Sequence, residues 1–530
     1  MPKDEKNNVL SREEIAAQRK ALNKYSTQML LSIILLSVVT ASAVALWSPG
    51  SFSAGWQAAF WICIPGFLVL WYLWKWGGKD KQLAAMILAA FALRLGFGLA
   101  TQNLLPKYGY PDEPRQKEGY LFDDAFRRDN EAWGIVQNEP RTFFEPITRK
   151  YDNDQYGGMI ALGIWIYRYL SPDARRFSLI FLIGAFFTAA GAIFLRKAIR
   201  DRGNSQLASI AGWIYVLYPD SIFYSGAAMR EPFLIGIVAA AFWALSTLKN
   251  HMKKSLIVLA VCLISCLPFS DFIAGALLCI SILWIWVEFL ISQNKKWLWG
   301  GITVIVVGVA VVAFVFWPSI SNFIHFDIVT TEKGSGWVEK VIGEVGGKFR
   351  PVFLAFYGIT QPVLPAILVY PTRPYWKVVG IIRAVGWYAM VPFLFYALFS
   401  TLRVKDKKQK ALLTVNAIFL LVWIFVASLR AGGDQWDNPR YRVIFIPWLA
   451  YFSAWGYCFA KQQKDWWLVR WIAIELIFLF FFTQWYISRY SGNAIRRFPF
   501  WKTVIYILIG SALVFATGWI EPILHKKKKN

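Results

Sequence analysis

Apolar runs without charge, each about 20 residues long, constrain this chain more than any other feature. Examples are Leu30 to Trp47 and Ile302 to Trp317. Such a run crosses the ~30 Å hydrocarbon core as a helix, because a helix satisfies every backbone polar group within the segment. The chain is 57% hydrophobic with a mean hydropathy of +0.42, which excludes an ordinary soluble protein. The sequence therefore predicts an all-α polytopic membrane protein.

About fourteen spans are expected, together with amphipathic juxtamembrane helices in the first large outer loop. The proline-rich stretch 351–370 is expected to be re-entrant or interfacial instead of spanning. The expected spans are 27–47, 56–75, 83–101, 176–196, 206–218, 232–248, 255–270, 272–291, 297–317, 377–402, 411–429, 442–460, 467–487 and 500–520.

The net charge of +25 is distributed in a way that predicts topology and argues against nucleic-acid binding. If residues 1–26 are a cytosolic leader, alternate loops on the same side carry 24 Lys and Arg against 4 acids. The loop 102–156 then lies outside, with 8 basic and 11 acidic residues. Positive charge on the cytosolic side is the normal pattern. Only 489–497, with three arginines, runs against it. We therefore expect both termini in the cytosol and the acid-rich loops outside.

The first candidate site is an acidic pair, Asp123-Asp124, in the long outer loop. Phe122, Phe126 and Trp133 follow helical spacing, which predicts an amphipathic helix on the membrane surface. One acid would cap this helix, and the other would act as a general base or metal ligand. The structural alternative is a helix cap beside a solvated acid.

The second candidate is the corner that leads from Tyr218-Pro219 to Arg230-Glu231. Proline ends a helix, so the chain should turn here at the outer face. Glu231 either lies at a helix start because the macrodipole favours it, or lines an outward cavity with Arg230.

The third candidate is 432–442, in which glycines precede Asp437, Arg440, Tyr441 and Arg442. Arginine binds phosphate with two hydrogen bonds and keeps its charge when partly buried, so a lipid phosphate would suit this depth. The alternative is an interfacial arginine that reaches for lipid headgroups.

Weaker candidates support these three. Arg94 lies inside a span and needs a partner or a cavity. Asp154 is a further acid of the outer loop, in a segment typical of a turn. His325 is the only outer histidine, which excludes a multi-histidine metal site. A divalent cation such as Mg²⁺ or Mn²⁺ held by carboxylates stays open.

The order of these features resembles the GT-C superfamily of polyprenyl-phosphate-dependent glycosyltransferases. The carrying features are Arg94 at a span, Asp123-Asp124 in a long outer loop, Glu231 at an outer corner and the late Arg440-Tyr441 pair. Protein O-mannosyltransferases and aminoarabinose transferases belong to that superfamily. No WWDYG run of the oligosaccharyltransferase type is present, so a single-sugar donor fits better.

The resemblance implies a domain plan. Residues 83–460 would form the GT-C-like catalytic module, with outer loops 102–175 and 318–376. A cytosolic leader (1–26) and two additional spans (27–82) would precede it, and the C-terminal spans with a basic cytosolic tail (461–530) would follow it.

The resemblance also implies an enzyme of the cell (plasma or inner) membrane, active on the outer face in cell-envelope glycosylation. It would move a sugar from a polyprenyl-phosphate donor to a lipid, glycan or protein acceptor, with inversion. Asp124 or Asp123 would be the base, Glu231 would bind acceptor or metal, and Arg440 and Arg442 would hold the donor phosphate.

Two other functions remain open. A lipid-linked glycan flippase or transporter predicts charged pairs deep within the spans. A polysaccharide polymerase or ligase would depend on arginines, with no essential carboxylate in the outer loop. Both would share membrane lipids as partners with the transferase.

Overall fold

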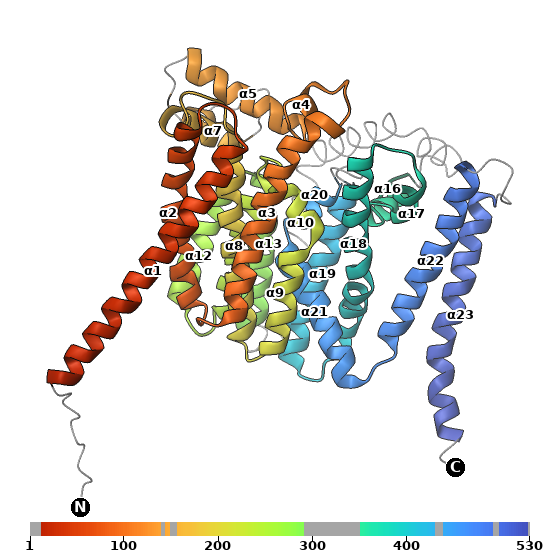
Figure 1. The fold of residues 1–530 in the computed structure, drawn as a ribbon. Helices are drawn as coiled ribbons and strands as arrows, with labels where there is room; N and C mark the ends of the chain where they lie inside the picture. Colours follow the sequence, from red (N-terminus) through yellow and green to blue (C-terminus); the bar gives the residue numbers. More distant parts are fainter. Residues whose placement is uncertain are drawn as a thin grey trace, which may run out of the picture.

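The computed structural model describes residues 12–138, 142, 144–148, 156–290, 350–429, 438–490 and 498–527, and this part of the chain contains helices and no strand. The protein is an all-α membrane protein in its described part (Figure 1). The helices are α1 (Arg12–Leu46), α2 (Phe52–Trp76), α3 (Lys81–Tyr108), α4 (Pro114–Lys117), α5 (Asp123–Asn138), α6 (Glu145–Thr148), α7 (Gly158–Tyr169), α8 (Ser178–Arg200), α9 (Ser205–Leu217), α10 (Pro219–Ser225), α11 (Glu231–Thr247), α12 (Met252–Cys266), α13 (Asp271–Ile285), η1 (Trp286–Leu290), α16 (Arg350–Ile359), α17 (Leu364–Val369), α18 (Pro374–Ser400), η3 (Thr401–Arg403), α19 (Lys407–Leu429), α20 (Asn438–Val443), α21 (Ile446–Gln463), α22 (Trp467–Tyr490) and α23 (Phe500–Lys527).

Within the described ranges, nine helices are long and apolar enough to cross a membrane, so the expected count of fourteen is not confirmed. The apolar helices α9 and α11 are shorter, with 13 and 17 residues. The expected span 297–317 lies outside the described residues. The nine candidates are Thr27–Leu46, Phe52–Trp76, Lys81–Tyr108, Ser178–Arg200, Asp271–Phe289, Pro374–Arg403, Lys407–Leu429, Trp467–Arg489 and Phe500–Gly518.

In two stretches the helix boundaries differ from those that hydrophobic periodicity predicts. Helix α1 begins at Arg12, inside the segment expected to be a leader, because that segment is rich in strong helix formers. The expected span 442–460 is divided into α20 and α21, with Pro447 in the first turn of α21. The division places Arg440 and Arg442 on a short helix of their own.

Helices α8 and α11 form the centre of the bundle. Small residues allow their close contact: a side chain at Gly236 would meet the Phe187 carbonyl oxygen at 2.6 Å, and one at Gly184 would meet the Pro232 ring at 2.9 Å. Nearly every residue of α11 is buried. A polar group on this helix is therefore far from lipid and needs a partner within the protein.

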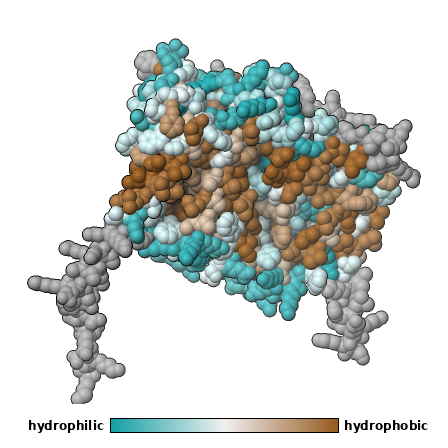
Figure 2. All heavy atoms as spheres, viewed as in Figure 1, coloured by the Kyte–Doolittle hydropathy of each residue, from teal (hydrophilic) through white to brown (hydrophobic). Residues whose placement is uncertain are grey.

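The two ends of the bundle differ. At one end, called the α5 end here, helices α4, α5 and α7 cover the bundle (Figure 1). At the opposite end, called the basic end, Arg196 donates to Asp80 over 2.6 Å and thereby joins α8 to the start of α3. Figure 2 shows a hydrophobic band between two hydrophilic rims, as expected for a protein that crosses a bilayer.

Candidate functional site

The candidate site lies at the α5 end, where the α10–α11 corner meets α5 and α20. Tyr218 ends α9 in an extended conformation, and Pro219 starts α10, as the proline in the sequence predicts. Gly226 follows α10 and approaches the backbone of Gly98 so closely that a side chain would meet its nitrogen at 2.8 Å. This contact holds the corner against α3 and fixes where Glu231 begins α11.

Arg440 joins two carboxylates that are far apart in the sequence. Its Nε donates to Oε1 of Glu231 over 2.5 Å, and its Nη1 lies 3.5 Å from Oδ2 of Asp124. Arg440 is 4% exposed and Glu231 is 0% exposed. Three of the predicted residues, contributed by α5, α11 and α20, therefore form one cluster, called the Asp124–Arg440–Glu231 cluster below.

Asp124 is the less buried of the two acids. Its burial acts to raise its pKa, but Arg128, Arg440 and Arg127 outweigh that effect and hold the pKa of Asp124 below its ordinary value of 3.8. Arg127 donates to it over 2.7 Å, and Arg128 lies 3.6 Å away. The carboxylate is therefore ionised at neutral pH and surrounded by cations.

Glu231 is fully buried, and among the described residues its Oε2 has no hydrogen-bond partner. The neighbouring Arg230 lies 3.8 Å from Oε1, donates to the Phe269 carbonyl over 3.0 Å and stacks on the Tyr156 ring at 4.8 Å. The Oε2 oxygen of Glu231 is thus buried beside two arginines without a hydrogen bond from any described residue. A buried oxygen in that state costs free energy unless a ligand donates to it.

A second buried network lies next to the cluster. Arg383 of α18 donates to Asp220 over 2.6 Å and to the Tyr224 hydroxyl over 2.7 Å. Arg442 lies 3.7 Å from Asp220, and its guanidinium is 3.4 Å from the ring centre of Trp387. Although Arg442 is only two residues from Arg440, its contacts are with this structural network and not with Glu231 or Asp124.

Arg94 is fully buried but lies outside the cluster. It donates to the carbonyls of Ala90, Tyr215 and Val216 and to the Ser221 hydroxyl, over 2.9 to 3.2 Å. These contacts satisfy the last carbonyls of α9. The residue therefore holds the α9–α10 corner, and none of these four hydrogen bonds reaches the cluster.

The remaining predicted residues are placed as follows. Asp123 pairs with Arg127 over 2.9 Å, and its side chain is 55% exposed, compared with 34% for Asp124. The Tyr441 carbonyl accepts a hydrogen bond from Trp423 over 3.2 Å. The Tyr441 ring lies 5.9 Å from the Arg440 guanidinium. Asp154, Asp437 and His325 lie outside the described residues.

The sequence analysis missed a buried acid, Asp129, on α5. The Tyr120 hydroxyl donates to it over 2.5 Å, Tyr167 donates to its other oxygen, and Arg175 lies 3.6 Å away. Burial raises the pKa of Asp129 to about 6, although the two hydroxyls and Arg175 act to lower it. A signal was present: position 129 falls on the apolar stripe of Phe122, Phe126 and Trp133, where a lone acid needs partners.

The described residues of the cluster do not by themselves form a divalent-cation site. In the described part of the chain, no three His, Cys, Asp or Glu side chains lie together as a metal site would need. The guanidinium of Arg440 also lies between Asp124 and Glu231, where a cation would have to bind.

Searches against protein-family models, curated proteins and solved structures find no match to this chain. The resemblance to the GT-C superfamily therefore stays a prediction that rests on the residues described above.

Proposed function

We propose that the protein is an inverting membrane glycosyltransferase that moves a sugar from a polyprenyl-phosphate donor to a hydroxyl-bearing acceptor. The observation that carries the proposal is the guanidinium of Arg440 held between Asp124 and Glu231. A sugar transfer from a phosphate carrier needs both a base and a cation for the leaving phosphate.

The proposed reaction uses the cluster in one displacement. Asp124 accepts the proton of the acceptor hydroxyl, whose oxygen attacks the anomeric carbon of the donor. The bond from that carbon to the phosphate oxygen breaks, and the electron pair leaves with the polyprenyl phosphate. Arg440 stabilises the phosphate charge, and Glu231 orients the guanidinium through its 2.5 Å hydrogen bond. Attack from the face opposite the phosphate inverts the configuration.

The pKa of Asp124 suits this role in one respect and limits it in another. A lowered pKa keeps the carboxylate ionised and ready to accept a proton at neutral pH. It also makes the carboxylate a weak base, so the transition state must resemble an oxocarbenium ion with a departing phosphate. When the donor phosphate binds Arg440, the cation's hold on Asp124 weakens and the carboxylate becomes more basic.

The proposal also assigns the cluster to one side of the membrane. The loops at the basic end carry a large excess of Lys and Arg over acids, which favours the cytosol, and the cluster would then face outward. Both termini would be cytosolic, and the membrane would be the plasma or inner membrane of the cell.

One observation favours the flippase or transporter instead. The pair of Arg383 and Asp220 is fully buried, and Arg383 lies nine residues into the spanning helix α18, or about 14 Å along it. A charged pair at such depth is typical of a transport path. The network around this pair also binds Tyr224 and stabilises the corner, which is the reason the transferase is preferred.

The test is a donor panel. Purified protein in nanodiscs receives polyprenyl-phosphate sugars and an acceptor mixture, and mass spectrometry follows the release of free polyprenyl phosphate. Asp124→Asn should reduce the rate by roughly 10²–10⁴-fold, because a general base contributes about that much. Glu113→Gln, a partly exposed acid at the same end, is the matched control and should keep the wild-type rate.

Each alternative has its own outcome. Full activity of Asp124→Asn would refute the carboxylate mechanism and favour the polymerase or ligase. No release from any donor, combined with movement of labelled lipid between leaflets, would favour the flippase. Asp123→Asn completes the series, because loss of activity in that variant alone would move the base to the neighbouring acid.

A further inference from the structure

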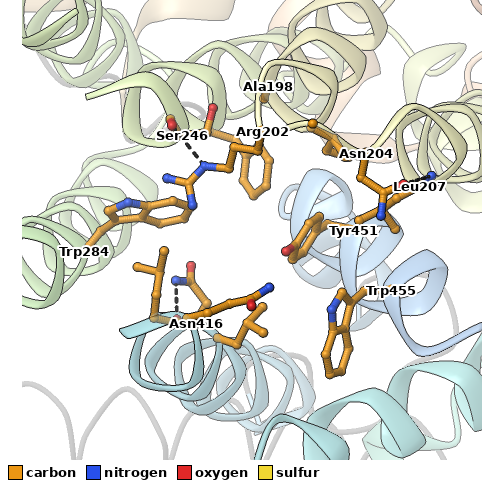
Figure 3. A pocket seen from close by; sticks show the side chains of 15 residues that line it. Ala198, Arg202, Asn204, Leu207, Ser246, Trp284, Asn416, Tyr451 and Trp455 are labelled. Carbon is orange, nitrogen blue, oxygen red and sulfur yellow. Dashed lines mark hydrogen bonds between the residues drawn. The ribbon is translucent and has the colours of Figure 1, made fainter. Parts of the chain in front are cut away.

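A cavity lies at the basic end of the bundle, remote from the Asp124–Arg440–Glu231 cluster. Its volume is about 340 Å³, and it is enclosed by the α8–α9 loop and by α11, α13, α19 and α21 (Figure 3). Helix α11 connects the two sites, with Glu231 at its start and Ser246 of the cavity 15 residues later. That separation corresponds to about 22 Å along the helix.

Most of the cavity wall is apolar and aromatic. Such a wall suits a hydrocarbon segment, and Asn204, Gln409 and Asn416 add polar groups to it. The apolar wall includes Leu207, Phe242, Trp284, Leu412, Leu413 and Trp455.

A cation, Arg202, forms part of the wall of this cavity. Figure 3 shows Arg202 extended along the cavity wall beside Trp284 and Ser246, with Tyr451 facing the open space. The Nε of Arg202 donates to the Ser246 carbonyl over 3.0 Å, and its guanidinium lies 5.3 Å from the Trp284 ring centre. Both contacts fix the side chain against one wall of the cavity, and its Nη2 faces Glu288.

The terminal nitrogens of Arg202 keep donor capacity. Among the described residues its nearest acid is Glu288, and that ion pair measures 3.7 Å, which is longer than a hydrogen bond. The same carboxylate is shared with Lys408, also at 3.7 Å. One acid thus faces two cations, Arg202 of the cavity wall and Lys408, the neighbour in sequence of the lining residue Gln409.

The surrounding loops add to this charge. The segments 196–202 and 403–410 together contain nine Lys and Arg and only two Asp. Basic pockets between spanning helices are a recognised binding mode for anionic lipid headgroups, because the helices enclose the chain and the cations hold the phosphate.

We propose that this cavity binds a phosphate group carried on an apolar chain, as in the headgroup region of an anionic phospholipid. Arg202 donates to the phosphate from inside the cavity, Lys408 approaches it from the rim, and the Tyr451 hydroxyl donates to an ester or phosphate oxygen. The aromatic wall encloses the start of the chain. The inference is independent of the transfer reaction proposed for the α5 end.

The test is a binding titration of the delipidated full-length protein, followed by native mass spectrometry. Short-chain phosphatidic acid is the probe, and short-chain phosphatidylcholine is the zwitterionic comparison. Phosphatidic acid should bind at least about tenfold more tightly, and Arg202→Gln should remove that preference, because one charge-assisted bond is worth about that factor. Lys405→Gln is the matched control: it removes an exposed lysine of the same basic segment that does not line the cavity.

Two further arms keep the test decisive. If Arg202→Gln does not fold, Gln409→Trp replaces an exposed lining residue and should block the mouth. Inorganic phosphate tests the source of the ligand: competition at equal concentration would identify free phosphate as the occupant of the same site. Equal binding of the two lipids, or equal affinity in Arg202→Gln and Lys405→Gln, would overturn the proposal.

Discussion

Replacement of Arg440 by glutamine tests whether the cluster is held together by charge. The change removes a buried cation and leaves Glu231, which is fully buried, with Arg230 at 3.8 Å as its remaining cation. Removal of one partner of a buried pair costs about 3–5 kcal/mol, and the residual contact to Arg230 places this case near the lower limit, about 3 kcal/mol. A total stability of about 5–15 kcal/mol makes such a loss readily measurable.

A double-mutant cycle separates this effect from simple loss of packing. Glu231→Gln alone should cost about 2 kcal/mol, because Arg440 keeps Asp124 at 3.5 Å. The double variant should cost roughly 3 kcal/mol, less than the sum of about 5, since neither charge is then left alone. The expected coupling energy is therefore about 2 kcal/mol.

The assay is reversible unfolding in mixed micelles, followed by the fluorescence of the 28 tryptophans. Arg115→Gln, which breaks a partly exposed pair with Glu113 at 3.4 Å, is the control and should cost less than about 1 kcal/mol. A cost below about 1 kcal/mol for Arg440→Gln, or strict additivity in the double variant, would refute the buried bridge.

Three further outcomes are expected. Burial raises the pKa of Asp129 to about 6 from an ordinary 3.8, so its contribution to stability is full below about pH 4 and is lost as pH rises through about 6. The unfolding midpoint of the wild type should therefore fall over that pH window, and the midpoint of Asp129→Asn should stay level. Equal slopes in the two proteins would contradict this prediction. Arg94→Lys should destabilise the protein by about 1.5–3 kcal/mol in the same assay, because one ammonium cannot reach all four acceptors; an unchanged midpoint would show that the corner does not depend on Arg94. In intact cells, an impermeant maleimide should label Glu113→Cys but label Lys405→Cys only after permeabilisation, and the reverse pattern would invert the proposed topology.

Local sequence patterns predicted the helices well because their causes are local. The turn at Pro219, the start of α11 at Glu231 and the amphipathic α5 all follow from proline geometry, end effects and 3.6-residue periodicity. The number of spans was harder to predict, since α9 and α11 are apolar but short, and α20 separates from α21 at a proline.

The candidate site could be predicted in its residue types but only partly in its contacts. Asp124, Glu231 and Arg440 were each identified from the sequence, and they do meet. Arg442 was grouped with Arg440 because the two are neighbours in sequence. On the helix α20 they take different partners, since side chains two residues apart point in different directions.

By itself, the sequence determined that this is a helical membrane protein with basic loops on one side and an acid-rich loop on the other. Transfer of a helix into lipid depends on the summed hydropathy of its own residues, which can be read along the chain. Only the tertiary structure decided which buried charges pair. Arg440 is 209 residues from Glu231 and 316 from Asp124. A buried charge must find a partner, but many pairings satisfy that rule, and the close packing of helices such as α8 and α11 selects one of them.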